Sequence, residues 1–337
     1  MLARLRSVKA TQRCLFTGVL LLALVLLWSQ GCGRKSGFTA APPSAKQSRP
    51  ILYDQELHQL LIYYATSDSR YLVPVTATVN PTREVAKTAV EKLLAGPPGE
   101  GLLRTVPEGV KLREIYSFPD EKVAYVDLTK EFLQMNGPSE ADMAVRSLTL
   151  TLTELKDIEG VKLLVEGKNL TELAGLKLAE TLQRPAAINS LQGEAGKKAT
   201  VQVYFGDRNC LYLVPVTLAV QETELKDLPR AALLALLAGP PKDSGLFPTV
   251  WPGTKLRSLH IQDGVAFVDL SKEAVAYGGG SAAETLFVNS LLWTLTQFGS
   301  IDKVQLLFEG QKKDYLPEGT AVKEPLARPN KLNAVPM

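Results

Sequence analysis

An internal repeat constrains this chain more than any other feature of its sequence. The nine residues YLVPVTATV at positions 71–79 return as YLVPVTLAV at positions 212–220. Further blocks recur in the same order at offsets of about 141 to 144 residues, far longer than the 20 to 50 residues of a solenoid unit. The paired blocks are LLAGPP with LLAGPP, TVPEGVKLR with TVWPGTKLR, VAYVDLTKE with VAFVDLSKE, and VKLLVEG with VQLLFEG. A repeat of this length predicts two whole domains that share one fold.

The positions of the repeats divide the chain into domains and connecting segments. Residues 33–50 are rich in Ser, Ala, Pro and Lys and poor in apolar residues, which is typical of a flexible tether. The stretch SLQGEAGKK separates the two copies. The predicted organisation is a signal peptide at 1–32, a linker at 33–50, a first domain at 51–189, a linker at 190–198 and a second domain at 199–331.

The N-terminus has the layout of a secretory signal. A basic stretch precedes the apolar run CLFTGVLLLALVLLW, which is shorter than the roughly 18 residues of a membrane span. Gly31 and Cys32 follow, as in a bacterial lipoprotein signal with lipidation at Cys32, although Ser29 and Gln30 depart from that pattern. The alternative is an uncleaved signal anchor. Either version predicts a body tethered to the cytoplasmic membrane and facing outside the cytoplasm; stable lipid anchoring would need a second acyl chain.

The charge of the chain argues against a nucleic-acid partner. The chain has 38 Lys and Arg against 35 Asp and Glu, and four of these bases lie in residues 1–31, which hold no acid. The remainder is nearly neutral and shows no block of Lys or Arg interleaved with aromatic residues. Of the three cysteines, only Cys210 lies in the predicted folded region, so that region cannot form an internal disulfide.

Comparison of the two copies predicts an α+β fold. Each copy reads as ββαββαβ, a two-layer domain with helices covering one sheet face, so the body is two tandem copies behind the signal or anchor and tether. The second helix is ambiguous in the first copy, because LTLTLTEL alternates like a strand. The matching AETLFVNSLLWTLTQF does not alternate, so we predict a helix in both copies. Ser139 and Ser281 each stand three residues before an acid, which predicts a capping box at the start of these helices.

Two prolines mark the second predicted strand of each copy. Pro74 and Pro215 occupy the same place in the repeated LVPVT, and proline lacks the N–H that a central strand must donate. The strand is therefore predicted to lie at a sheet edge. Such an edge is either protected or bent, or it is a place where another chain docks.

The repeated blocks resemble a known family. LVPVT, LLAGPP, GTKLRSLHIQDGVAFVDLSKE, SLLWTLTQFGSIDKVQLLFEG and the closing EPLARP look like the GerMN domain, and the resemblance covers nearly all of residues 55–330. Two such domains behind a lipoprotein signal resemble the lipoproteins of sporulation and spore germination in endospore-forming bacteria. The resemblance implies a non-catalytic module outside the cytoplasm, needed for building or opening the spore envelope. By analogy with related small α+β units of secretion-like assemblies, it also implies a role in protein assembly.

The residues that could carry catalysis do not form a recognisable constellation. His58 and His260 occupy unmatched positions outside any metal-binding motif, and the sequence has neither a Gly-x-Ser-x-Gly elbow nor a phosphate-binding loop. Asp127 and Asp269 recur at a strand end, where an acid commonly binds backbone N–H groups of the next turn. Glycan hydrolysis normally needs two carboxylates, and we expect no second acid beside these aspartates. The same structural interpretation applies to Glu166 and Glu309. We therefore predict no enzyme activity, cofactor or metal.

Two functions remain open from the sequence. The first is a scaffold that binds other spore-envelope proteins, with Pro74, Pro215 and Trp251 as candidate interaction residues. The second is an accessory protein that binds or remodels peptidoglycan. For the second, Tyr71, Tyr212 and Trp251 are the aromatic side chains that we expect to be exposed and able to stack on sugars.

Overall fold

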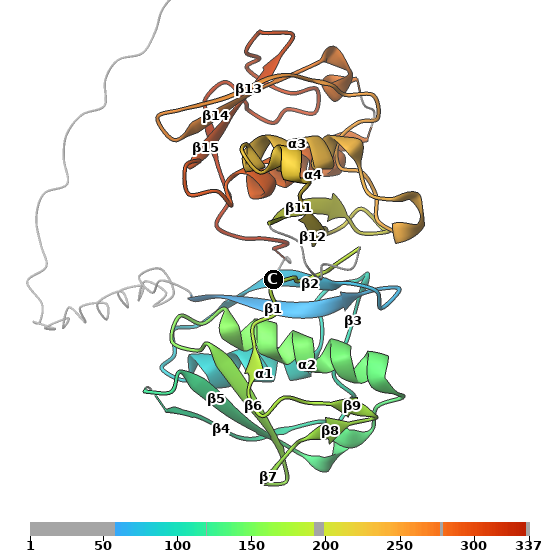
Figure 1. Ribbon diagram of the computed structural model, residues 1–337, viewed down its shortest axis with the longest axis vertical. Helices are drawn as coiled ribbons and strands as arrows, with labels where there is room; N and C mark the ends of the chain where they lie inside the picture. The colour runs from blue at the N-terminus through green and yellow to red at the C-terminus, as the bar shows by residue number, and fades with distance from the viewer. Residues whose placement is uncertain (1–57, 119, 192–198, 277–278, 335–337) are drawn as a thin grey trace, which may run out of the picture. The chain divides into compact units, whose positions relative to one another are not determined.

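The computed structural model describes residues 58–334 apart from 119, 192–198 and 277–278 (Figure 1). The predicted signal peptide, the lipidation site Cys32 and the linker at 33–50 lie outside the described residues, as does most of the linker at 190–198. Both repeats belong to one compact unit, Asp54–Met337. Within the described part of the chain, no helix combines the length and the apolar character that a membrane crossing requires.

The first repeat contains every predicted element. Its two long helices are α1 (Val85–Ala95) and α2 (Pro138–Thr153), and a 3-10 turn spans Lys130–Leu133. Its strands are β1 (His58–Thr66), β2 (Leu72–Val79), β3 (Leu102–Leu103), β4 (Leu112–Phe118), β5 (Val123–Leu128), β6 (Gly160–Val165), β7 (Lys168–Asn169), β8 (Glu172–Leu173), β9 (Leu176–Lys177) and β10 (Leu182–Gln183).

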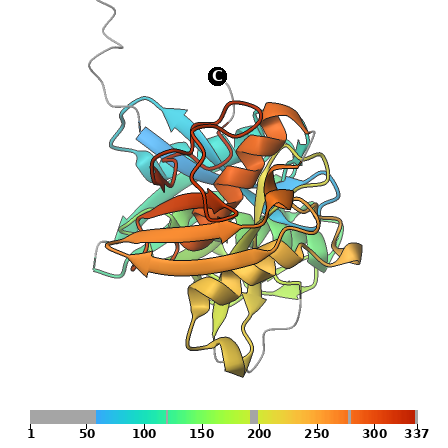
Figure 2. The same ribbon diagram turned by 90° about the horizontal axis from the view of Figure 1, so that it is seen from above.

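The second repeat follows the same order. Its helices are α3 (Leu228–Ala238) and α4 (Gly280–Leu295), with 3-10 turns at Glu222–Glu224, Lys242–Ser244 and Lys272–Val275. Its strands are β11 (Thr200–Gly206), β12 (Leu213–Ala219), β13 (Leu256–Gln262), β14 (Val265–Leu270), β15 (Lys303–Phe308) and β16 (Leu326–Ala327). Seen from above, β13 and β14 run side by side as an antiparallel hairpin (Figure 2).

The strands of each repeat fall into two main sheets, where the sequence predicted one. In the first repeat the sheets are β2-β1-β3 and β10-β6-β5-β4, and in the second they are β11-β12 and β13-β14-β15-β16. The helices contact both sheets of their own repeat and lie between them in Figure 1. The strand before each second helix runs parallel to the strand after it, as a helical crossover requires. The α+β class and the ββαββαβ order are therefore confirmed, with a second sheet added to each repeat.

Side chains of the second helix keep the first hairpin apart from the larger sheet. The Ser147 hydroxyl donates to the Tyr63 carbonyl over 2.7 Å, and the Tyr63 N–H donates to Thr151 Oγ1 over 3.2 Å. In the second repeat the Tyr204 N–H donates to Thr294 Oγ1 over 3.3 Å. Because the helix satisfies the outward backbone groups of β1 and β11 at these positions, no further strand is needed there.

Residues 148–153 of the alternating segment LTLTLTEL belong to α2, which confirms the helix predicted from the second copy. Its polar positions are compatible with a helix because they face bonding partners. Thr149 donates to the Val145 carbonyl one turn earlier, over 2.8 Å, and Thr151 accepts from β1. The apparent β pattern thus arises from threonines that serve a buried helix.

The predicted capping boxes are wrong. The caps of α2 and α4 are Gly137 and Gly279, and neither described cap makes a side-chain hydrogen bond. The helices begin one residue before the serines, so the acids are not placed to reach back. Glu284 is instead fully buried and accepts from the backbone N–H groups of Glu318 and Thr320, over 2.8 and 2.7 Å.

Replacing Thr294 with valine tests the bond between α4 and β11. The variant keeps the side-chain shape but leaves the buried Tyr204 N–H without its acceptor, which should lower the free energy of unfolding by about 1–3 kcal/mol. Urea denaturation measures the change. Thr285→Val, at an exposed position of the same helix, is the matched control. Equal stability of the two variants would contradict this account of β11.

Candidate functional site

The proline strands lie at sheet edges, as predicted, and other segments of the same chain bind them. β2 is the outer strand of its sheet. β12 has β11 as its one strand partner in the described structure, besides a single bridge between Thr217 and Ser190. Pro74 lies opposite Tyr63, and Pro215 lies opposite Tyr204. Without an N–H, each proline offers only its carbonyl at the outer edge.

Asn189 binds strands of both repeats at once. Its side-chain oxygen accepts from the Leu72 N–H over 2.8 Å, and its amide donates to the Leu72 carbonyl over 2.8 Å and the Pro215 carbonyl over 2.7 Å. The residue is buried. A single side chain therefore satisfies three backbone groups, two in β2 and one in β12.

Asn333 makes the reciprocal set of contacts. Its oxygen accepts from the Leu213 N–H, and its amide donates to the carbonyls of Leu213 and Pro74, each over 2.8 Å. Asn189 and Asn333 occupy equivalent places in the repeats, and each binds its own edge strand and the partner edge strand. The junction between the repeats thus has the self-complementary character of a two-fold dimer interface.

Tyrosine contacts repeat the same reciprocity, and backbone contacts follow it with acceptors shifted by one position. The Thr76 N–H donates to the Leu332 carbonyl over 2.9 Å, and the Thr217 N–H donates to the Asn189 carbonyl over 2.7 Å. The Tyr71 hydroxyl donates to the Ser244 carbonyl over 2.6 Å, and the Tyr212 hydroxyl to the Glu100 carbonyl over 2.9 Å. Because Tyr71 and Tyr212 are 4% and 8% exposed, they are not the exposed stacking residues that the sequence suggested.

The asparagines were missed in the sequence, although a signal for them exists. The closing block EPLARP ends at Arg-Pro, whereas the repeat continues as RPAAIN at 184–189 and RPNKLN at 328–333. The apolar residue before each asparagine is also matched, and it is buried in both copies. The shared tail, and not the strand alone, defines the junction.

Removing the asparagine bridges should weaken the fold. Asn189→Ala leaves the Leu72 N–H and two carbonyls without their partner, so we expect a loss of about 1–3 kcal/mol in the free energy of unfolding. Asn333→Ala should have a similar effect, because its contacts are equivalent. Chemical denaturation measures both, with Asn169→Ala at an exposed position as the control. Stabilities indistinguishable from the control would contradict the assignment.

Trp251 lines an apolar pocket of the second repeat. This Trp251 pocket has a volume of about 440 Å³ and lies between the segment 247–252 and α4. Trp251 and Phe247 are 44% and 46% exposed, and Leu286 and Phe287 line it from the helix. None of the described lining residues is charged. The free thiol of Cys210 also faces it.

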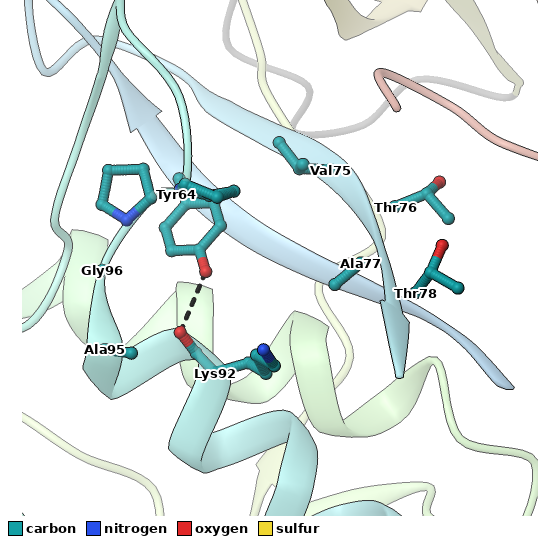
Figure 3. Close-up of a pocket in the computed structure, with 10 residues that line it drawn as sticks. Tyr64, Val75, Thr76, Ala77, Thr78, Lys92, Ala95 and Gly96 are labelled. Atoms are coloured by element: carbon teal, nitrogen blue, oxygen red, sulfur yellow. Dashed lines mark hydrogen bonds between the residues drawn. The ribbon is translucent and has the colours of Figure 1, made fainter. Parts of the chain in front are cut away.

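A second pocket lies in the first repeat, between β2 and the end of α1 (Figure 3). It has a volume of about 420 Å³ and is bordered by the repeated segments LVPVT and LLAGPP. The Tyr64 hydroxyl donates to the Lys92 carbonyl over 3.0 Å, as Figure 3 shows. Gly96, at φ +89°, ends the helix, and the Arg104 guanidinium donates to the Ala95 carbonyl over 2.9 Å. Tyr64 and Lys92 do not form a nucleophile and base pair.

Burial raises the pKa of Tyr64 to about 12, against an ordinary value of 10, although the nearby Arg104 opposes the shift. The folded state therefore binds the phenolic proton more tightly than the unfolded chain does. The resulting stabilisation is complete below pH 10 and is lost as the pH rises towards 12. We expect the urea midpoint of the native protein to fall more steeply over this range than that of Tyr64→Phe. Parallel pH profiles would contradict the contribution of Tyr64.

The recurring acids form two matching ion clusters. Arg113 Nη1 lies 2.7 Å from Asp127 and its Nε lies 3.6 Å from Glu166. Asp127 also accepts from the Gly167 N–H over 2.9 Å, and Glu166 from the Lys130 N–H over 3.1 Å. The equivalent cluster contains Arg257, Asp269, Glu309, Gly310 and Lys272. The expectation that no second acid accompanies the aspartate is thus wrong, because Glu166 and Glu309 arrive from another strand. The acids hold the strand ends together.

The remaining candidates for chemistry are dispersed. His260 stacks on Phe267 with 4.6 Å between ring centroids, and His58 begins β1. The described residues include no group of three His, Cys, Asp or Glu placed to hold a metal ion.

Comparison with known proteins gives a family match in each repeat. The family described as "Germane: Sporulation and spore germination" matches residues 61–171 and 202–314. Both matches begin within the first strand of a repeat and extend beyond β6 or β15. The family match therefore covers most of each repeat.

One solved structure similar to this chain has the same tandem arrangement. The spore germination protein GerM of Bacillus subtilis (strain 168) is 29% identical over 287 residues, which are 80% of this chain and 77% of that protein. The solved tandem GerMN domains of the sporulation protein GerM from Bacillus subtilis have a TM-score of 0.64 and 26% identity, and the match covers 83% of this chain and 99% of that one. The solved first GerMN domain of the same protein matches 38% of this chain and 98% of its own, with 26% identity and a TM-score of 0.34.

Proposed function

Because the chain belongs to the Germane family of sporulation and spore germination proteins, we propose that it is a non-catalytic assembly protein of the spore envelope. In this proposal the second repeat binds a partner protein through the Trp251 pocket. The observation that carries the proposal is the exposed apolar pocket formed by Trp251, Phe247 and one face of α4.

The composition of the Trp251 pocket favours a protein partner. Aromatic residues are enriched at the centres of protein interfaces, where a few side chains supply most of the binding energy. A glycan would also need polar groups around the aromatic ring to bind its hydroxyls, and the described lining is largely apolar and uncharged. The pocket therefore suits an apolar side chain from another protein better than it suits peptidoglycan.

The aromatic pair is specific to the second repeat. The residues that match Phe247 and Trp251 in the first repeat are Leu103 and Pro107. The two repeats therefore present different surfaces at this place, although they share a fold. We propose that partner binding belongs to the second repeat, while the first repeat contributes mainly to the joint body.

The N-terminal segment supports a location at the membrane. The signal-like residues 1–32 and the tether at 33–50 would hold the body outside the cytoplasm at the cytoplasmic membrane, through lipidation of Cys32 or an uncleaved anchor. Such tethering raises the local concentration of the body near other membrane proteins. This placement is consistent with assembly at the envelope.

Capture experiments with matched variants test the proposed function. Three versions of the full-length protein are produced in sporulating cells: the native chain, Trp251→Ala and Tyr315→Ala. Each is crosslinked in the cells and purified with its bound proteins. Tyr315 is 65% exposed and lies outside the described lining of the Trp251 pocket. We expect Trp251→Ala to weaken binding of the captured, then purified, partner by about 2 kcal/mol or more, while Tyr315→Ala binds normally.

Sedimentation with purified peptidoglycan distinguishes the alternative. The proposal predicts that little protein sediments with the peptidoglycan, and that the native chain and both variants do so equally. Retention that disappears in Trp251→Ala, together with unchanged protein capture, would contradict the assembly role and favour peptidoglycan binding.

A further inference from the structure

Two arginines at equivalent positions have different surroundings. In the first repeat, Arg184 forms an ion pair with Glu154, whose carboxylate also accepts from the Tyr63 hydroxyl over 2.6 Å. In the second repeat, Arg328 takes the place of Arg184, and Gln297 takes the place of Glu154. The Gln297 side chain binds the backbone N–H and carbonyl of Gln202 in β11. No described carboxylate lies within ion-pair distance of Arg328.

Two acids at equivalent positions differ in the same way. Glu159 of the first repeat pairs with Lys122 over 2.5 Å. Asp302 takes the place of Glu159, and Gly264 takes the place of Lys122. The equivalence is structural, since the N–H of each acid donates over 2.7 Å to the carbonyl of Lys122 or Gly264. Among the described residues, Asp302 therefore has no basic partner.

The two unpartnered charges border one cavity. Arg328 and Asp302 line a space of about 400 Å³ together with Thr296, Ile301 and Asn330. The two side chains form no ion pair with each other, so the Arg328 nitrogens lie more than 4.0 Å from the Asp302 carboxylate oxygens. Opposite charges without an ion-pair partner among the described residues thus line the same space, whereas both equivalent side chains of the first repeat form ion pairs.

The cation of this cavity lies against an aromatic ring. The Arg328 guanidinium lies over the indole ring of Trp293, 4.6 Å from its centroid. A stacked guanidinium keeps its N–H groups in a planar fork that matches a carboxylate. Trp293 replaces Leu150 of the first repeat, so the platform is a further feature of the second repeat alone.

We propose that this cavity binds the zwitterion of a short unblocked peptide, with its carboxylate on Arg328 and its ammonium group on Asp302. A ligand that carries both charges satisfies both side chains, whereas a simple anion would face repulsion from Asp302. The volume lies within the range of small-molecule sites. The cavity shares no described lining residue with the Trp251 pocket, so the proposal is independent of partner binding there.

Binding of L-alanyl-L-alanine to the full-length chain in detergent micelles tests the proposal. The indole N–H signal of Trp293 reports binding by NMR and is assigned with Trp293→Phe, since the chain has three tryptophans. N-acetyl-dialanine lacks the ammonium group, and dialanine amide lacks the carboxylate. We expect each blocked form to bind about tenfold more weakly than dialanine, because one charged hydrogen-bond partner is lost.

Variants connect each end of the ligand to one side chain. Arg328→Gln should weaken dialanine binding about tenfold and leave the amide form unaffected, and Asp302→Asn should weaken dialanine and leave the N-acetyl form unaffected. Lys331→Gln, at an exposed position beside the cavity, should change nothing. Dialanine that binds no more tightly than both blocked forms, or that is insensitive to both variants, would overturn the proposal.

A gain-of-contact variant provides a test that does not remove either charge. Gly264→Lys introduces the lysine that pairs with Glu159 in the first repeat. Lys122 itself has φ +53° and Gly264 has φ +76°. A Cβ at Gly264 would lie 2.6 Å from Asp302 Oδ2, so the Asp302 side chain must move to admit the lysine. The new ion pair should neutralise Asp302 and weaken dialanine binding about tenfold. Unchanged dialanine binding in this variant would contradict the role of Asp302.

Discussion

The hydrogen bonds between two asparagine side chains and two proline-containing strands hold the repeats of this protein together. A proline in an edge strand presents a carbonyl but no N–H, so a neighbouring strand cannot form the complete set of backbone hydrogen bonds there. The amides of Asn189 and Asn333 supply that donor, and their oxygens accept from the neighbouring N–H groups of Leu72 and Leu213. Because each asparagine lies in the tail of one repeat and contacts the edge strands of both, the two edges protect one another. The strands are thereby withdrawn from pairing with other chains, which is the hazard of any exposed edge.

This arrangement separates the residues that build the body from those that can recognise something. The elements found in both repeats form the sheets, the helix side chains that bind β1 and β11, the ion clusters at the strand ends and the junction itself. The candidate binding features are found in one repeat only, such as Trp251 and the unpaired charges of Arg328 and Asp302. A duplicated fold can change one copy at these positions without disturbing the contacts that hold it together. The family to which the chain belongs is one of sporulation and spore germination. The binding sites that we propose lie at residues that differ between the two repeats.

The sequence predicted the order of elements well because each element has a strong local signal. Comparison of two copies also resolved the helix that contains LTLTLTEL, since chance alternation in one copy was absent from the other. The division into two sheets was not predictable in this way, because it depends on Ser147 and Thr151 reaching the backbone of Tyr63, far away in sequence. Asn189 and Asn333 give a weak signal in the sequence because asparagine is common in connecting segments. Only the recurrence of the asparagine within the matched tails distinguishes these two residues. Glu284 looked like a capping residue because its spacing from Ser281 fits, although its carboxylate binds a distant loop.

Hydrogen exchange at the amides of Leu72 and Leu213 tests the central claim most directly. Both N–H groups lie on edge strands, and both donate to an asparagine side chain from a repeat tail. If these bridges join the repeats, the two amides exchange as slowly as those of the core strands in the native protein, and Asn189→Ala and Asn333→Ala accelerate exchange at both edges. Rapid exchange of both amides in the native protein, while the rest of β2 and β12 stays protected, would contradict the account.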